Sequence, residues 1–167
     1  MQESVKAIVI DYNDSGISWI GGYQDIIEEL KMEYDGKLET HLHFDAVTLN
    51  INGVRLSAYV DDEGLLKGKP LTFVEGYPEP LAGKIVITGA PDDEGYDTSI
   101  PFKDVPAIKY HPVAWDINYY QAIEQIKFNL ANGVEYSHIH NYDPTVLGKY
   151  PTGYLGRQAE KRAKNEA

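Results

Sequence analysis

Two short histidine motifs are the features of this sequence whose residue types and spacing most directly suggest chemistry. Four of the five histidines fall in two His-x-His pairs, His41-Leu42-His43 and His138-Ile139-His140. On a β-strand, residues i and i+2 face the same side, so each pair would present two imidazoles together. Imidazoles combined with a carboxylate are common ligands of zinc and iron in proteins.

A carboxylate lies close to each pair. Asp45 follows the first pair at the next same-face position, and Asp143 comes shortly after the second. If the two strands were neighbours, one metal site would comprise His41, His43, Asp45, His138, His140 and Asp143. Zinc would then be the cofactor, and a metal-dependent hydrolase the function. The alternative is that both pairs lie on polar faces of half-exposed strands and that the protein has no cofactor.

Other catalytic signatures are missing from the sequence. It contains no cysteine, no Gly-x-Ser-x-Gly motif, no P-loop and no dinucleotide-binding glycine pattern. The lack of cysteine excludes disulfide scaffolds, thiolate nucleophiles and cysteine metal sites. We therefore expect a non-enzymatic protein, with the hydrolase as an open alternative.

The charge is distributed unevenly along the chain, whose formal net charge is −11. Residues 1–107 contain 20 acidic and 8 basic residues, whereas residues 108–167 contain 6 and 7. An acidic surface repels phosphate backbones, so we expect no nucleic-acid binding by residues 1–107. A host or phage protein with a basic surface is the partner that this charge favours. Two alternatives are mimicry of nucleic acid in a basic groove and an acidic surface that serves only solubility.

Tyrosine is unusually frequent, with 13 residues against 4 phenylalanines, and seven of the tyrosines lie from Tyr110 onward. Tyrosine combines a large apolar body with a polar tip, which suits a protein interface. It can also stack on nucleobases, so a small-ligand or nucleotide binder is another alternative, as is an amphipathic sub-core. The candidate interaction residues are Trp115, Tyr119, Tyr120, Tyr136 and Tyr142.

The N-terminal part of the sequence predicts a strand followed by a helix. The β-branched run over 5–12 is typical of a buried strand, and the turn-forming residues 13–16 should end it. Apolar residues at helical spacing predict a helix over 23–34, with acidic residues near its start and Gly36 at its end.

A β-meander is predicted next. Apolar and polar residues alternate over 38–44 and 47–51, and Asn52-Gly53 is a strong signal for a type I′ hairpin turn. The returning strand should place Val54, Leu56, Ala58 and Val60 on one face. Residues 84–88 form another buried strand, whereas 70–80, with three prolines, should be irregular.

The C-terminal part changes character after several prolines. Asp116 is the expected N-cap of a helix with Tyr119, Ile123, Ile126 and Leu130 on one stripe, closed by Asn132-Gly133. A short strand over 134–140 and a charged tail over 157–167 follow. The expected fold is α+β: an antiparallel β-meander with an acidic helix, followed by a helical, Tyr-rich C-terminal extension. We expect an acidic α+β domain over 1–107, with residues 108–167 as an extension packed on it.

One segment resembles a known family. Residues 61–70, Asp-Asp-Glu-Gly-Leu-Leu-Lys-Gly-Lys-Pro, are similar to the most recognisable stretch of the DUF3846-like family, a phage and mobile-element domain of unknown function. The glycine-bracketed strand 83–89 and the acidic turn 92–95 are similar to later parts of that family, so the resemblance covers about residues 5–105. It departs at Leu71-Thr72, where the family has Asn soon after the proline.

The resemblance implies a β-rich fold and an origin on a mobile element, and it carries no catalytic residues across. Together with the charge, it favours an uncharacterised, non-enzymatic accessory protein of a phage or mobile element that acts by protein binding. No apolar run approaches the roughly 18 residues of a membrane span. The N-terminus, Met1 to Ser4, lacks the layout of a signal peptide, so we expect a cytoplasmic protein with no membrane contact.

Overall fold

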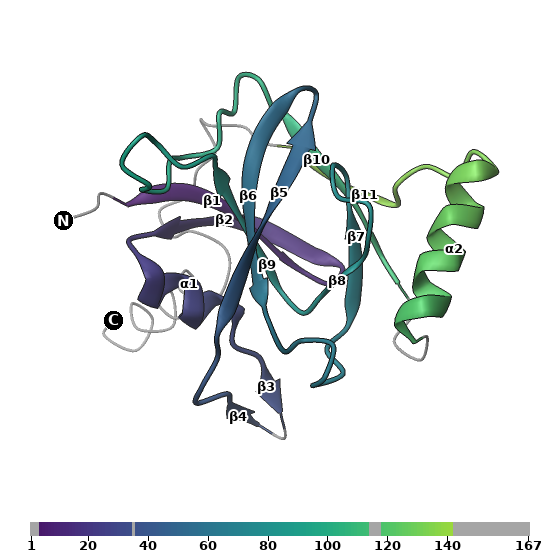
Figure 1. The fold of residues 1–167 in the computed structure, drawn as a ribbon, viewed down its shortest axis with the longest axis horizontal. Helices are drawn as coiled ribbons and strands as arrows, with labels where there is room; N and C mark the ends of the chain where they lie inside the picture. The colour runs from purple at the N-terminus through teal and green to yellow at the C-terminus, as the bar shows by residue number, and fades with distance from the viewer. Residues whose placement is uncertain (1–3, 35, 114–117, 142–167) are drawn as a thin grey trace, which may run out of the picture.

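The structure is a computed structural model that describes residues 4–34, 36–113 and 118–141. Within these residues, two larger antiparallel sheets, one two-stranded hairpin and two helices form an α+β fold in which strands predominate (Figure 1). The predicted class is therefore confirmed, and the arrangement of the strands decides which side chains come together.

The larger sheet has five strands in the order β2-β1-β9-β6-β5, and every pairing is antiparallel. Its strands are β1 (Val5–Asp11), β2 (Asp14–Ile20), β5 (Phe44–Ile51), β6 (Val54–Asp61) and β9 (Ile85–Gly89). β5 and β6 form the predicted hairpin, in which Asn52 and Gly53 have φ values of 53° and 79°. Both values are positive, as a type I′ turn requires.

The smaller sheet has four strands in the order β11-β10-β7-β8, also antiparallel. Its strands are β7 (Leu71–Val74), β8 (Leu81–Ala82), β10 (Ala107–Pro112) and β11 (His138–Asn141). The sheet thus draws strands from both sides of the expected boundary at residue 107, because β10 pairs with β7. The division into two domains stays a prediction.

The main hydrophobic core lies between the two sheets. Side chains from both sheets are buried in it, among them Ile8, Leu49, Ile87, Val74 and Ile108. The side chains of Leu56, Ala58 and Val60 on β6 point into this core with Val54 packed against it, so their predicted shared face is confirmed.

The two helices cover the outer faces of this sandwich. Helix α1 (Tyr23–Leu30) packs Ile26 and Leu30 on the outer face of the larger sheet, near Val86. Helix α2 (Tyr119–Ala131) packs Ala122 and Ile126 on the smaller sheet. In the part of the chain that the structure describes, neither helix has the length and apolar character needed to cross a membrane.

The N-terminal elements differ from the prediction in two places. Strand β2 begins at Asp14 and pairs with the whole of β1, so the turn is confined to residues 12 and 13. The helix ends at Leu30, because Lys31 is extended. The next residues form a small hairpin of β3 (Glu33–Tyr34) and β4 (Lys37–Leu38). Gly36, with a φ of 78°, belongs to this hairpin and does not end the helix.

The strand predicted over 38–44 is also mostly wrong. Residues 39–43 lie in neither helix nor strand, and only the two ends of the range pair with neighbours. Conversely, the range 70–80 contains β7, because its prolines flank the strand and leave the N–H groups of residues 71–74 available for pairing.

Helix α2 begins later than predicted and ends as predicted. Asn118 is the N-cap: its side chain accepts a hydrogen bond from the Gln121 N–H at 2.9 Å, and the Gln121 side chain accepts one from the Asn118 N–H. This reciprocal pair is a capping box. Asp116, the predicted N-cap, lies outside the described residues. Asn132 and Gly133 follow the last turn, and Gly133 has a φ of 77°.

Candidate interaction site

Four charged side chains form a closed cluster beneath the loop that joins β6 to β7. Lys69 Nζ lies 2.5 Å from Glu39 Oε1 and 2.7 Å from Asp61 Oδ2. Lys67 Nζ lies 2.8 Å from the other Glu39 oxygen and 2.8 Å from Asp61 Oδ2. Each lysine therefore bridges the same two carboxylates, and we call these four residues the ion cluster.

The ion cluster is almost wholly removed from water. The side chains of Lys69, Asp61 and Glu39 are 0%, 1% and 8% exposed, and that of Lys67 is 25% exposed. Burying a charge is costly unless opposite charges and hydrogen bonds compensate it. Backbone N–H groups supply further donors: Glu63 N–H donates to Asp61 Oδ1 and Met32 N–H to Glu39 Oε1, each at 2.9 Å.

The electrostatics keep Glu39, Asp61 and Lys67 ionised. Burial by itself raises the pKa of Glu39 and of Asp61, but the hydrogen bonds from Lys67 and Lys69 outweigh it and hold both pKa values below their ordinary range. Burial likewise lowers the pKa of Lys67, and the two carboxylates more than reverse this effect. The carboxylates and Lys67 are therefore charged at neutral pH.

Glycines let the backbone close around the cluster. A Cβ at Gly64 would lie 2.8 Å from the carbonyl oxygen of Ala82, and one at Gly83 would lie 2.8 Å from Lys69 Cδ. The Gly83 N–H also donates to the Pro70 carbonyl at 2.7 Å. Gly64, from the segment 61–70, and Gly83, at the start of the glycine-bracketed strand, therefore have a packing role, since a side chain at either position would displace the loop or a lysine.

The segment above the cluster, residues 62–68, is here called the leucine loop. The Lys67 N–H donates to the Glu63 carbonyl and the Lys69 N–H to the Gly64 carbonyl, each at 3.0 Å, so the loop is internally bonded. At its tip the side chains of Leu65 and Leu66 are 53% and 89% exposed. The exposed acidic residues Asp62 and Glu63 adjoin them. The ion cluster thus fixes a loop that presents two leucines with acidic neighbours.

The chemistry open to this arrangement is that of an interface. The charges of the ion cluster are directed at one another, so they hold the loop and leave the leucines to make outside contacts. Glu39, Lys67 and Lys69 are not among the predicted site residues. Glu39 is distant in sequence from the two lysines, and the strand expected around it does not form. The sequence feature that points to the ion cluster is the Lys-x-Lys spacing of Lys67 and Lys69 within an acidic segment.

The first histidine pair lies near this loop. His41 and His43 are exposed and flank the buried Leu42 on the segment before β5, and Asp45 is exposed on β5. The Asp62 N–H donates to the His43 carbonyl at 3.0 Å, so the pair adjoins the leucine loop. Both imidazoles are accessible, although the segment is not the strand that was predicted.

The second histidine pair lies on the other sheet. His138 is on β11 and its ring stacks on Tyr110, with 5.2 Å between the ring centroids. The side chain of His140 and all of Asp143 lie outside what the structure describes. Among the described side chains, no three His, Cys, Asp or Glu residues are grouped closely enough to hold a metal ion. The six-residue metal site stays a prediction.

Two of the candidate tyrosines attach α2 and the segment after it to the smaller sheet. Tyr119 OH donates to Glu79 Oε2 at 2.6 Å, and the Tyr136 ring stacks on Phe73 with centroids 5.4 Å apart. Tyr120 is largely exposed and touches Tyr119 edge-on. Trp115 and Tyr142 are not among the described residues. These contacts favour the sub-core interpretation for Tyr119 and Tyr136.

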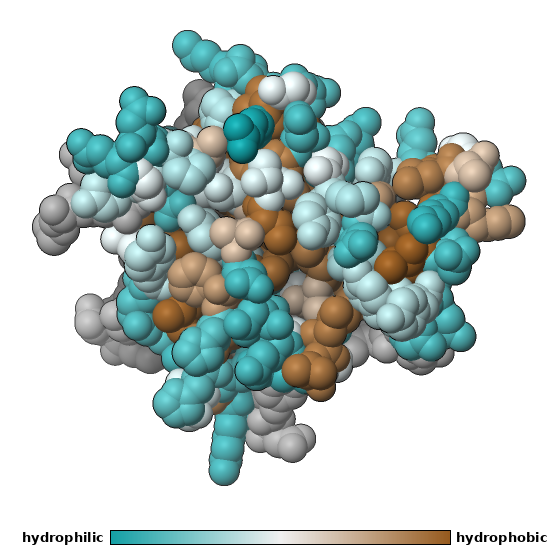
Figure 2. Space-filling model, in the orientation of Figure 1, coloured by the Kyte–Doolittle hydropathy of each residue, from teal (hydrophilic) through white to brown (hydrophobic). Residues whose placement is uncertain are grey.

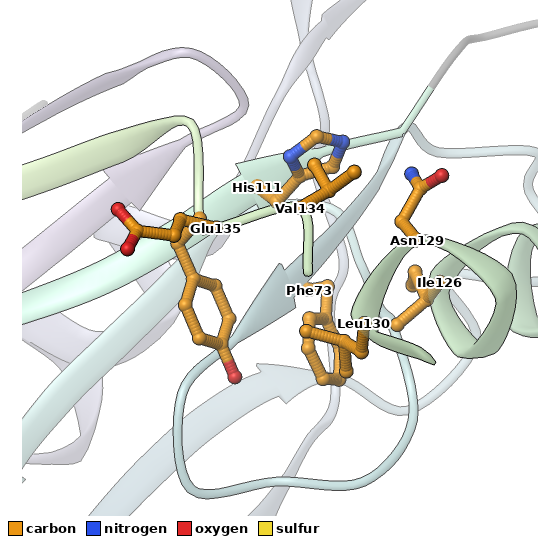
Figure 3. A pocket seen from close by; sticks show the side chains of 8 residues that line it. Phe73, His111, Ile126, Asn129, Leu130, Val134 and Glu135 are labelled. Carbon is orange, nitrogen blue, oxygen red and sulfur yellow. The ribbon is translucent and has the colours of Figure 1, made fainter. Parts of the chain in front are cut away.

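A small pocket lies between α2 and the smaller sheet (Figure 3). Its volume is about 10 Å³, close to what a single water molecule needs. Burial and the neighbouring His138 lower the pKa of His111, which lies at its edge. The lining residues are Phe73, His111, Ile126, Asn129, Leu130, Val134, Glu135 and Tyr136. The pocket is too small to support a nucleotide site.

A row of aromatic rings runs from α1 across the start of β5 to β6. The Tyr23 and Phe44 ring centroids lie 5.8 Å apart, and those of Phe44 and Tyr59 lie 5.4 Å apart. Tyr59 OH donates a hydrogen bond to the buried carboxylate of Asp97. Burial raises the pKa of Tyr59, and Asp97 raises it further, so this phenol stays neutral well into the alkaline range. No periodic pattern in the sequence indicates the Tyr59–Asp97 pair.

The comparison with protein families agrees with the resemblance seen in the sequence. The model of a family described as "Domain of unknown function (DUF3846)" matches residues 41–110. No curated protein and no solved structure matches the sequence. The match starts later than the expected range of 5–105 and contains the leucine loop and three residues of the ion cluster, while Glu39 lies just before it. Residues 41–110 are therefore a DUF3846-like domain of unknown function.

Proposed function

We propose that this protein is a non-enzymatic accessory protein that acts by binding another protein, and that the leucine loop makes the contact. The observation that carries this proposal is the exposure of Leu65 and Leu66 on a loop that a buried ion cluster holds in place. A loop fixed beforehand loses little conformational entropy on binding, so its apolar contacts contribute more fully to affinity.

The partner suited to this loop is a protein with an apolar pocket bordered by basic residues. Asp62 and Glu63 adjoin the two leucines, and residues 1–107 carry 20 acidic against 8 basic residues. Complementary charge raises the association rate and makes it sensitive to salt. The family resemblance implies an origin on a phage or mobile element, and the partner is then a host or phage protein.

The two alternatives have less support. A metal-dependent hydrolase would need the histidine pairs to converge, yet His43 precedes a strand of the larger sheet while His138 lies on the smaller one. A nucleotide binder would need a larger cavity than the one beside α2. Protein binding requires only an exposed surface such as the leucine loop, which the ion cluster fixes in place.

Capture of partners by tagged full-length protein, at low and high salt, tests the proposal. The variant Leu65→Ser with Leu66→Ser should lose a protein that the wild type captures, and raised salt should weaken that capture. The matched control is Leu130→Ser, which alters an exposed leucine on α2, away from the loop. Equal capture by the wild type and the double variant would rule out the leucine loop as the contact.

A further inference from the structure

Strand β5 is an open edge of the larger sheet. Among the described strands it pairs only with β6. In an antiparallel pair the N–H groups of alternate residues point toward the partner strand and away from it. The Asn50 N–H donates to the Gly76 carbonyl at 3.2 Å, on the side away from β6. The N–H groups of Ala46 and Thr48 share this orientation, because they lie four and two residues before Asn50.

The contact at Asn50 shows that this edge can bond to an additional backbone. A Cβ at Gly76 would lie 2.7 Å from the Asn50 carbonyl oxygen, so the two backbones approach as closely as glycine allows. Gly76 covers only the end of the strand, and Ala46 and Thr48 are exposed. Edge strands are commonly protected by lysine, proline or bulges, whereas β5 contains neither lysine nor proline.

An apolar platform lies beside the other end of the same edge. Tyr23 on α1 is 66% exposed and contacts Phe44, the first residue of β5. Figure 1 shows α1 beside the larger sheet near the start of β5, and in Figure 2 apolar side chains gather along β5 and β6 in the middle of this face. A strand added to β5 could therefore place one apolar side chain on the exposed tyrosine ring.

We propose that β5 accepts an extended, basic segment of the partner protein as an additional strand. This inference rests on the protein-binding function proposed above and names the form of the bound segment. Exposed Asp45 lies on β5 itself, exposed Asp62 follows β6 at the same end of the hairpin, and half-buried Glu75 precedes Gly76 at the other end. Arg55, opposite Asn50 on β6, is the basic residue of this hairpin. A second copy of the chain would bring like charges together, since each copy carries −11. Complementary charge therefore favours a basic segment over self-association.

Two synthetic peptides test the proposal on the full-length protein. Each has eight residues, the length of β5, with β-branched residues alternating with Lys in one peptide and with Glu in the other. Fluorescence anisotropy should show binding of the Lys peptide and about tenfold weaker binding of the Glu peptide. Amide hydrogen exchange on the saturated complex should slow at Ala46 and Thr48.

The variant Thr48→Pro isolates the backbone contribution, because proline lacks the outward N–H and is tolerated on edge strands. Its affinity for the Lys peptide should fall about tenfold, whereas Thr48→Val, which keeps the N–H, should bind as the wild type does. If Thr48→Pro fails to fold, Ala46→Pro replaces it, and the exchange measurement on the wild type needs no variant.

Three results would overturn the inference: no binding of the Lys peptide, equal binding by Thr48→Pro, or unchanged exchange at Ala46 and Thr48. A wild-type dimer that Thr48→Pro converts to monomer would also overturn it, since the occupant would then be a second copy. The proposed protein-binding function is tested separately from the strand addition, because it depends on Leu65 and Leu66 and not on the edge of β5. Loss of partner capture in the leucine variant, with normal capture by Thr48→Pro, would leave that function standing without the strand addition.

Discussion

Lys69 Nζ lies 2.7 Å from Asp61 Oδ2, and both side chains are buried. These two residues stand at the two ends of the leucine loop, Asp61 at the end of β6 and Lys69 shortly before β7. The ion pair therefore joins the ends of the loop, Lys67 within the loop also contacts Asp61, and Glu39 contacts both lysines. The most recognisable segment of the sequence is therefore a loop held at its base by buried ion pairs, with the two leucines and the acidic Asp62 and Glu63 exposed.

Removing the buried lysine should destabilise the protein strongly. Lys69→Met leaves Asp61 and Glu39 buried with one cation fewer, and breaking a buried pair in this way costs about 3–5 kcal/mol. Urea unfolding followed by circular dichroism measures the loss. Lys67→Met is the matched control and should cost less, because Lys67 is partly exposed. Equal losses in the two variants would mean that burial does not determine the strength of these pairs.

Stability should also fall in acid because of the same cluster. The folded-state pKa values of Glu39 and Asp61 lie below their ordinary values of 4.5 and 3.8, so the unfolded chain binds more protons in this range. Their contribution is therefore present above pH 4.5 and is lost as the pH falls through the folded pKa values. Urea midpoints measured from neutral pH downward should show this decline. Glu39→Gln, which cannot titrate there, should show a shallower decline below pH 4.5.

Prediction from the sequence was most successful where a short sequence pattern is compatible with only one local structure. Asn52-Gly53 predicted the hairpin of β5 and β6, and the β-branched runs predicted β1 and β9. Strand β2 was missed because Asp14, Ser15 and Gly16 are typical turn residues, and pairing along the whole of β1 overrides that local preference. Strand β10 was missed because its pairing with β7 joins segments distant in the sequence.

The candidate site was harder to predict for the same physical reason. The motif at 61–70 was recognised as a sequence pattern, but its ion cluster depends on Glu39, which the predicted strand would have placed differently. The i, i+2 rule for His41 and His43 assumed a strand that does not form. Long-range contacts between charged side chains have no periodic signature, so only the folded structure brings these residues together.

The hairpin turn should tolerate glycine and reject proline at its first position. Asn52 has a φ of 53°, whereas proline is restricted to about −65°. Asn52→Pro should therefore reduce the free energy of unfolding by more than about 1 kcal/mol. Asn52→Gly is the control and should leave stability close to that of the wild type, since glycine adopts positive φ readily. A thermal melt of Asn52→Pro that matches the wild type would contradict the assigned turn.

The buried phenol of Tyr59 should contribute to stability, and it should not ionise while the protein is folded. Tyr59→Phe removes the hydrogen bond to Asp97 and leaves a buried carboxylate without that donor, which costs about 1–3 kcal/mol. Because burial and Asp97 raise its pKa, Tyr59 should not ionise before the protein unfolds in alkali. Ultraviolet titrations of the wild type and Tyr59→Phe should therefore coincide until unfolding. An extra ionisation in the folded wild type would contradict this account.

Zinc provides the final prediction, because it separates the binding function from the hydrolase alternative. His41 and His43 lie before β5, whereas His138 stacks on Tyr110 in the smaller sheet. A structural zinc site needs four ligands, and a catalytic site needs three with an open position. We therefore expect no stoichiometric zinc by elemental analysis and a zinc-induced Tm shift below about 2 °C. If each pair binds zinc weakly on its own, His43→Ala should not change the Tm shift caused by zinc at the second pair, and His138→Ala should not change the shift caused by zinc at the first pair. Stoichiometric zinc that either substitution abolishes would mean that the pairs converge, and the hydrolase would then replace the binding function.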